Sequence, residues 1–196
     1  MLPAPPVPAP RHLALLLFLA LLIGLNLGCL SLDDCGLFEY RRSLVAQGQW
    51  WRLATGHLVH LGWSHFLLNL AGLLLLLDLT RDWLGLPRAL IALTLSMTTI
   101  STGLWYAYPD IEWYRGLSGA LHGLWAAGAV AGMRQGSRIA RALAAILALK
   151  LLAEALGPDL LQHDFPVLHE AHWLGAAGGL VPALFLHPFP TSRHPP

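Results

Sequence analysis

The segment SHFLLNLAGLLLLLDLTR, residues 64 to 81, decides the class of fold that this chain can adopt. Its centre is a block of leucines from Leu73 to Leu77, and the charged stretch from Asp78 to Arg81 ends the apolar run. A helix needs about 20 mostly apolar residues to cross the roughly 30 Å hydrocarbon core of a bilayer. Within lipid, only helices and closed barrels satisfy their own backbone polar groups. The segment therefore predicts a membrane-spanning helix.

The composition of the whole chain agrees with a membrane protein. Of its 196 residues, 56% are hydrophobic and 12% are charged, whereas a soluble domain usually has about 25% charged residues. The formal net charge is +1, and lysines and arginines are scattered along the chain. Without a basic patch there is no electrostatic footprint for nucleic acid, so nucleic-acid binding is excluded.

The same length rule predicts six membrane-spanning helices and hence an all-α membrane protein. They are expected at about 13–30, 64–81, 88–106, 117–133, 139–156 and 171–186. Several are rich in glycine and alanine. The pairs Gly119 with Gly123 and Gly175 with Gly179 have the four-residue spacing of small residues that lets membrane helices pack closely.

The arginines indicate how the helices are oriented, since cytoplasmic segments carry an excess of positive charge. With both termini inside, the cytoplasmic segments hold Arg11, Arg81, Arg88, Arg134, Arg138, Arg141 and Arg193, and the outer segments hold Arg41, Arg42, Arg52 and Arg115. The distribution favours an N-in, C-in topology. It divides the chain into a cytoplasmic tail at 1–12, a membrane domain at 13–187 and a cytoplasmic tail at 188–196.

The long connection at about 31–63 is too polar to span the membrane. It contains Trp50, Trp51 and Trp63, and tryptophans prefer the membrane interface. We expect an outer loop that is partly embedded. Cys29 and Cys35 flank the outer end of the first span, where two neighbouring thiols on the oxidising side can form a disulfide. Two unpaired small apolar residues would explain them equally well.

Polar residues gather at one level of the predicted bundle. His60, His65 and Asn69 stand at the outer start of the second span, Ser118 at the start of the fourth and His172 at the start of the sixth. These spans all run inward from the outer surface in the predicted topology. Ionisable residues are costly in lipid and are functional candidates by default. Any one of these polar residues could have a purely structural role. Their occurrence together on three helices is harder to explain in that way.

The arrangement favours a nucleophilic serine. A serine hydroxyl is a weak nucleophile until a base accepts its proton, and His172 is the candidate base for Ser118. No acidic residue obviously orients His172, because Glu170 is two residues away on a different helical face. A Ser-His dyad is therefore more economical than a triad. Lys150 and Glu154, four residues apart, are interpreted as an intrahelical ion pair.

The oxyanion formed by an attacking serine needs donors that already point at it. The Asn69 amide, the His65 imidazole and the backbone N–H of Ser118 are the candidates. Gly116 and Gly119 flank the serine, and residues without a Cβ allow a tight turn and leave room for a substrate chain.

Four motifs together resemble the rhomboid family of intramembrane serine proteases. GLSG, formed by Gly116, Leu117, Ser118 and Gly119, is similar to the family's GxSG nucleophile motif. HLGWSHFLLN is similar to its HxxxxHxxxN pattern, AHWLGAAGG to the AHxxGxxxG around its catalytic histidine, and WWRLATGHLVH to its WR-containing loop. The resemblance covers about residues 47–186 and agrees in order, spacing and topology.

The resemblance implies a six-helix rhomboid-like bundle without a cofactor, in a bacterial inner membrane with its site towards the periplasm. Ser118 and His172 would be the catalytic dyad. His65 and Asn69 would stabilise the oxyanion, and His60 would support the loop or the hydrogen-bond network. The implied partners are transmembrane protein substrates and membrane lipid.

His122 departs from the common pattern, in which many rhomboids have a tyrosine that stacks on the catalytic histidine. GLSGALHG in a short core without a soluble domain most resembles the rhombosortase branch. That resemblance implies cleavage of C-terminal GlyGly-CTERM anchors, which consist of a Gly-Gly motif, a hydrophobic helix and a basic cluster. The role of His122 stays open between stacking, donating to the oxyanion and competing with His172.

Three alternatives remain at this stage. One is a general rhomboid protease with other membrane substrates, and another is a catalytically inactive binder of membrane helices. The third is a metal transporter or metal-binding protein, because imidazoles suit zinc or copper. The histidines concerned are His57, His60, His65, His122, His163, His169 and His172. Metal binding leaves the GLSG motif unexplained, and the chain has no HExxH motif.

Overall fold

The computed structural model describes residues 10–32, 34–156 and 167–185. These residues form six long helices, α1 (Pro10–Ser31), α4 (Trp63–Thr80), α5 (Leu86–Tyr106), α6 (Ser118–Arg134), α7 (Arg138–Leu156) and α8 (His169–Phe185). They lie at the six positions expected from the sequence, and their ends differ by only a few residues, as helix ends commonly do. The predicted tails at 1–12 and 188–196, apart from residues 10–12, lie outside the described residues, as does His163.

Three helices of the described chain are long and apolar enough to cross a membrane by length and composition. They are Leu13–Ser31, Trp63–Thr80 and Leu86–Tyr106, which belong to α1, α4 and α5. Helices α6 and α8 have only 17 residues each, or roughly 25 Å at 1.5 Å per residue. Helix α7 contains the charged residues Lys150 and Glu154 within its apolar run. The protein is mostly helical, and the count of six spans stays a prediction.

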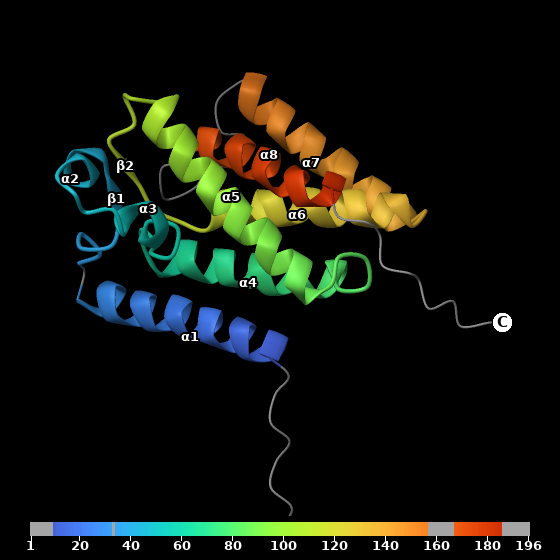
Figure 1. Cartoon of the computed structure of the whole chain (residues 1–196), viewed down its shortest axis with the longest axis horizontal. Coiled ribbons are helices and arrows are strands. Elements are labelled where there is room, and N and C mark those ends of the chain that lie inside the picture. The colour runs from blue at the N-terminus through green and yellow to red at the C-terminus, as the bar shows by residue number, and fades with distance from the viewer. Residues whose placement is uncertain (1–9, 33, 157–166, 186–196) are drawn as a thin grey trace, which may run out of the picture.

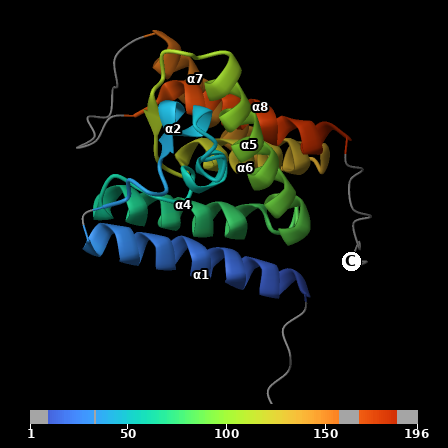
Figure 2. The same ribbon diagram turned by 60° about the vertical axis from the view of Figure 1, so that its left-hand side comes forward.

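Helix α6 lies at the centre of the bundle, where it contacts α4, α5, α7 and α8, and α5 also packs directly against α8 (Figure 1). Helix α1 lies alongside α4 at the edge of the bundle, in Figure 1 and in the turned view of Figure 2. Almost all of α6 is buried, although its residues are small. Small side chains are what allow so many neighbours to approach one helix.

Glycines bring α6 and α8 into backbone contact. A Cβ added at Gly175 would overlap the carbonyl oxygen of Gly119, and one added at Gly179 would overlap that of Gly123. The two pairs with four-residue spacing in the sequence are thus packed against each other. This contact places the start of α8 next to the start of α6.

The segment between α1 and α4 is folded rather than extended. It contains β1 (Tyr40–Arg41), α2 (Arg42–Ala46) and α3 (Arg52–Thr55), and β1 pairs antiparallel with β2 (Trp113–Tyr114), which precedes α6. Buried Arg52 donates to the carbonyl oxygens of Gly36 and Glu39, and the Glu39 carboxylate binds Arg115. Desolvation lowers the pKa of Arg52. These bonds fix the connection that leads into α6.

A disulfide joins Cys29, near the end of α1, to Cys35. Of the two alternatives that the sequence left open, the structure has the bonded one. Both cysteines are buried and pack against Val59, and the Cys35 sulfur lies 3.8 Å from the carbonyl oxygen of His60. The crosslink closes the short segment that follows α1, and it packs against the loop in front of α4.

Candidate active site

Ser118 is the first residue of α6, and the turn before it requires glycine. Gly116 has a φ of 123°, a conformation that other residues rarely adopt. A Cβ there would also lie 2.7 Å from Cε1 and 2.9 Å from Nε2 of His65. The Gly116 N–H donates to the carbonyl oxygen of Gly56. Gly116, two residues before the serine, is thus needed for its backbone conformation and for the space that His65 occupies.

Tyr114 holds this turn by a hydrogen bond, and His57 packs against Tyr114. The Tyr114 hydroxyl donates to the carbonyl oxygen of Gly116, and its ring meets the edge of the His57 ring. His57 Nε2 donates to Ser101 Oγ over 2.8 Å, because that hydroxyl itself donates to the carbonyl oxygen of Leu53. Burial raises the pKa of Tyr114 and lowers that of His57 from 6.5 to about 4. Both groups are therefore neutral supports.

His172 lies in the first turn of α8 and faces the serine. Its Nε2 is 3.2 Å from Ser118 Oγ, and its side chain is buried. The packing of Gly175 on Gly119 sets this approach, because these glycines follow His172 and Ser118 by three and one positions on their helices. The structure brings together the two residues that the sequence proposed as nucleophile and base.

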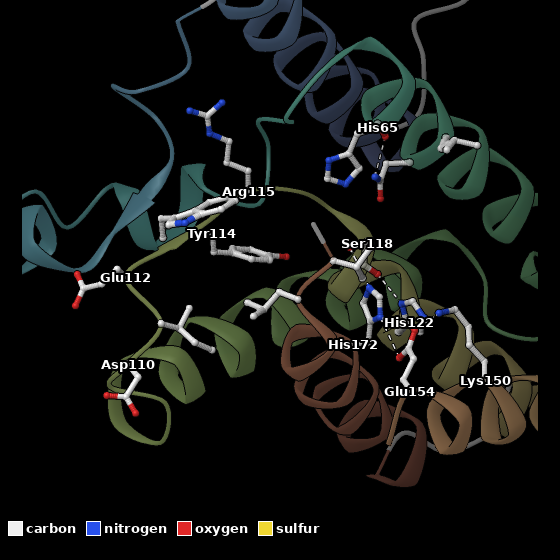
Figure 3. A pocket seen from close by; sticks show the side chains of 16 residues that line it. His65, Asp110, Glu112, Tyr114, Arg115, Ser118, His122, Lys150, Glu154 and His172 are labelled. Carbon is white, nitrogen blue, oxygen red and sulfur yellow. Dashed lines mark hydrogen bonds and ion pairs between the residues drawn. The ribbon is translucent and has the colours of Figure 1, made fainter. Parts of the chain in front are cut away.

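Glu154 of α7 makes a contact that the sequence interpretation missed. Its two carboxylate oxygens lie 3.0 and 3.1 Å from Nδ1 of His172, as the dashed lines in Figure 3 show. The expected ion pair with Lys150 is also present. The expectation that no acidic residue orients His172 was wrong. Only contact between α7 and α8 produces this pairing, and sequence spacing carries no trace of it.

His122 stacks on His172, with ring centroids 4.0 Å apart and planes inclined by 17°. Its Nδ1 donates to the carbonyl oxygen of Ser118 over 2.8 Å, because a carbonyl can only accept. Its Nε2 is buried without a hydrogen-bond partner among the described residues. Of the three roles left open for His122, this geometry favours stacking.

His65 and Asn69 stand across the site on α4, one turn apart. The Asn69 amide donates to the carbonyl oxygen of His65 over 2.9 Å, and the Leu61 N–H points at His65 Nδ1 over 3.5 Å. Both side chains line the same cavity as Ser118 and His172. Leu117 is the N-cap of α6, so the Ser118 N–H has no acceptor within the helix.

His60 connects the serine turn to α1. Its Nε2 accepts from the Leu117 N–H over 3.3 Å, and its Nδ1 donates to Asn26 Oδ1 over 3.0 Å. The Asn26 amide in turn donates to the carbonyl oxygens of Leu22 and Leu58, each over 2.7 Å. Burial lowers the pKa of His60 from 6.5 to about 3. Asn26 was missed from the sequence, although a lone amide in a leucine-rich helix is a usable signal.

A cavity of about 580 Å³ is lined by Ser118, His172 and their neighbours. Its lining comes from α4, the segment before α6, helices α6, α7 and α8, and the two residues before α8, so separate parts of the chain converge on it (Figure 3). The polar residues that line it from α6, α7 and α8 are Ser118, His122, Lys150, Glu154 and His172. A peptide segment of a few residues fits such a volume.

The chain matches the model of the rhomboid domain over residues 47–189. The chain belongs to the rhomboid family. It is also 35% identical over 80 residues to the putative rhomboid protease YdcA of Bacillus subtilis (strain 168). That match covers 41% of this chain and 40% of the relative. A rhomboid is a membrane protein, in agreement with the three apolar helices.

The rhomboid match contains every residue of the predicted site and also Lys150 and Glu154. Asn26 and the two cysteines lie before its start. The part of the network that reaches α1 is therefore outside the shared domain.

His122, Glu154 and His172 are also the group of described residues that could hold a metal ion, with donor atoms within 4.8 Å of one another. A metal bound by two imidazoles lies near the plane of both rings. Here the two rings are stacked almost parallel, and the nitrogens of His172 already face Ser118 and Glu154. Lys150 adds a positive charge at the same carboxylate. The geometry suits a hydrogen-bonded site better than a metal centre.

Proposed function

We propose that this rhomboid is an intramembrane serine endopeptidase in which Ser118 is the nucleophile and His172 is the general base. The observation that carries the proposal is the 3.2 Å approach of His172 Nε2 to Ser118 Oγ at the base of a cavity. A nucleophile within hydrogen-bond reach of a base is the signature of covalent catalysis. Family membership over most of the chain supports the same conclusion.

In the first step, Ser118 Oγ attacks the carbonyl carbon of the scissile peptide bond while its proton moves to His172 Nε2. The carbonyl oxygen becomes an oxyanion, for which the Ser118 N–H, at the positive end of the α6 dipole, is a donor. The side chains of His65 and Asn69 across the cavity are the proposed further donors. When the C–N bond breaks, the imidazolium gives its proton to the leaving amine.

The second step releases the acyl group from Ser118. Water, or an amine if the reaction is a transfer, gives a proton to His172 and attacks the ester carbon. The ester C–O bond breaks, and the proton returns to Ser118 Oγ. The stack of His122 on His172 supports this cycle by limiting the orientations of the imidazole ring.

The proposed setting is a bacterial inner membrane, with six spans, both termini in the cytoplasm and the cavity towards the periplasm. The distribution of arginines supports this topology. Substrates are proposed to be transmembrane proteins whose anchor helices unwind locally at a site of small residues. The most specific candidate is the GlyGly-CTERM anchor, in line with the resemblance of GLSGALHG to rhombosortase. Glycines unwind readily because they are poor helix formers.

The test is co-expression of the protein with a periplasmic reporter that ends in Gly-Gly, an apolar helix and a basic cluster. The wild type is expected to release the reporter domain, and Ser118→Ala to lower the rate by on the order of 10⁶-fold, to below detection. Ser64→Ala is the matched control, because Ser64 is an exposed serine at the start of α4. Undiminished cleavage by Ser118→Ala at equal expression would refute the assignment.

A second reporter separates the two substrate classes. Replacing Gly-Gly by Val-Val, with the helix and basic cluster retained, is expected to prevent cleavage if the site requires small, easily unwound residues. Equal cleavage of both reporters would identify a general rhomboid protease instead. Retention of metal uptake by Ser118→Ala, without any proteolysis by the wild type, would favour the metal-binding alternative.

A further inference from the structure

We infer that Glu154 is a positioning residue for His172, so that the site works as a Ser-His-Glu arrangement in which Lys150 holds the carboxylate. The inference rests on the proposed function of Ser118 and His172. In the dyad interpretation only α6 and α8 contribute residues to the reaction. With Glu154, α7 contributes as well.

The first argument is the hydrogen-bond geometry around His172. Both oxygens of Glu154 lie within 3.1 Å of Nδ1, and an ionised carboxylate can only accept a hydrogen bond. Nδ1 therefore carries the proton. The lone pair is then on Nε2, which faces Ser118 Oγ. This is the tautomer that a general base needs, and the carboxylate selects it.

The second argument is charge. The side chains of Glu154 and His172 are 9% and 4% exposed, whereas that of Lys150 is 34% exposed. A buried carboxylate is costly unless it is paired, and Lys150 supplies the pairing charge one turn away on α7. When His172 accepts the serine proton, the carboxylate lies between two cations. The positive charge formed in the reaction is thus stabilised where it appears.

The third argument separates this role from a simple intrahelical ion pair. An ion pair of Lys150 with Glu154 needs only one carboxylate oxygen, and Oε1 makes that contact. Both oxygens also face His172 of another helix, Oε1 at 3.0 Å and Oε2 at 3.1 Å from Nδ1, so the carboxylate joins α7 to α8 as well as pairing with Lys150. In Figure 3 the side chains of Lys150, Glu154, His172 and Ser118 form one continuous series at the base of the cavity.

The test uses the full-length protein in detergent and measures the rate at which a fluorophosphonate probe labels Ser118, which needs no knowledge of the natural substrate. Glu154→Gln is expected to slow labelling by on the order of 10³-fold, since its amide N–H can hold the wrong tautomer of His172. Glu154→Asp keeps the charge and is expected to restore part of the rate. Lys150→Met is expected to have a smaller effect than Glu154→Gln.

Glu170→Gln is the matched control. Glu170 lies two residues before His172 on α8 and is not among the described hydrogen-bond partners of that ring. Labelling by this variant is expected to equal that of the wild type. With a cleavable reporter, Glu154→Gln is further expected to lower kcat while KM stays unchanged, because Glu154 acts on the base rather than on bound substrate.

Each outcome bears on the inference. Equal labelling of Glu154→Gln and wild type overturns it, and so does equal loss in Glu154→Gln and Glu154→Asp together with a lowered Tm, which would indicate a structural ion pair. A wild type whose Ser118 does not react with the probe contradicts both the inference and the proposed function. A wild type that is labelled but leaves the Gly-Gly reporter intact contradicts only the proposed substrate.

Discussion

Helices α1 and α6 are opposites in how they meet their surroundings. Only 17% of the apolar window of α1 is buried within the protein, and many of its leucines are exposed, although Leu22 is buried in the core. Helix α6 is shorter, is rich in glycine and alanine, and is buried along most of its length. By length and composition together, α1 is a candidate membrane span, whereas α6, with 17 residues, is not among the candidates. Ser118, Glu154 and His172 of the proposed site lie on α6, α7 and α8, none of which is among the candidate spans of the described chain.

The physical reason is that lipid and protein neighbours favour different side chains. A helix that faces lipid gains from large apolar side chains, whereas a helix surrounded by other helices gains from small ones that allow close packing. In α6 the glycines that reduce its hydropathy also let Ser118 approach His172. Weak apolar character and catalytic geometry therefore have one cause.

The largest expected effect comes from adding a side chain at a glycine of α8 that packs on α6, compared with the same change at a glycine of α1. Gly175→Val adds side-chain atoms where even a Cβ overlaps the backbone of Gly119, so α8 must move away from α6. We expect Ser118 labelling to be lost and stability to fall by about 3 kcal/mol or more. Gly24→Val on α1 is the control, because no described atom lies within 4 Å of a Cβ there. Unfolding in mixed micelles measures the stability of both variants, and the fluorophosphonate probe measures labelling of Ser118. Equal losses in Gly175→Val and Gly24→Val would contradict the comparison.

A smaller effect is expected at Asn26, the buried amide through which α1 takes part in the site. Asn26→Leu removes the acceptor of His60 Nδ1 and the donor to the Leu58 carbonyl oxygen. Leaving such buried groups unpaired costs roughly 2 kcal/mol, and labelling of Ser118 is expected to slow because His60 supports the Leu117 N–H. Leu21→Ala, at a lipid-facing position of α1, serves as control. A wild-type labelling rate in Asn26→Leu would show that α1 only anchors the protein.

The smallest expected effect is the pH dependence of stability from His57 and His60. Burial lowers their pKa values from 6.5 to about 4 and about 3, so the unfolded chain binds protons that the folded chain does not. Their contribution is complete above pH 6.5 and is lost as the pH falls towards 4 and 3. At pH 5.5 the loss is about 1.4 kcal/mol for each histidine. His57→Asn is expected to reduce the slope of unfolding free energy against pH between 6.5 and 5. An unchanged slope would show that His57 does not contribute to the pH dependence of stability.

The position of the helices and the residues of the predicted site could be obtained from the sequence because both are local properties. Apolar length predicts helices at 13–30 and 64–81 without any knowledge of neighbours. The spacing of His65 and Asn69 places them on one face, and the glycines around Ser118 indicate a tight turn. Such patterns are recognisable because a helix repeats every 3.6 residues.

The contacts between helices could not be obtained in this way. The sequence shows that Glu154 is four residues from Lys150, but not that α7 brings it to His172. It shows two cysteines, but not whether they are bonded, and an asparagine in α1, but not the histidine that it meets.

The sequence by itself indicated a helical membrane protein and predicted that a serine, a candidate base and two further polar residues lie at the starts of three helices. Only the tertiary structure decided which side chains touch, and it added Glu154 to His172 and Asn26 to His60. The reason is physical. Helix formation in lipid depends on each segment's own backbone and apolar length, whereas hydrogen bonds between helices depend on how glycines and other small residues let separate segments approach.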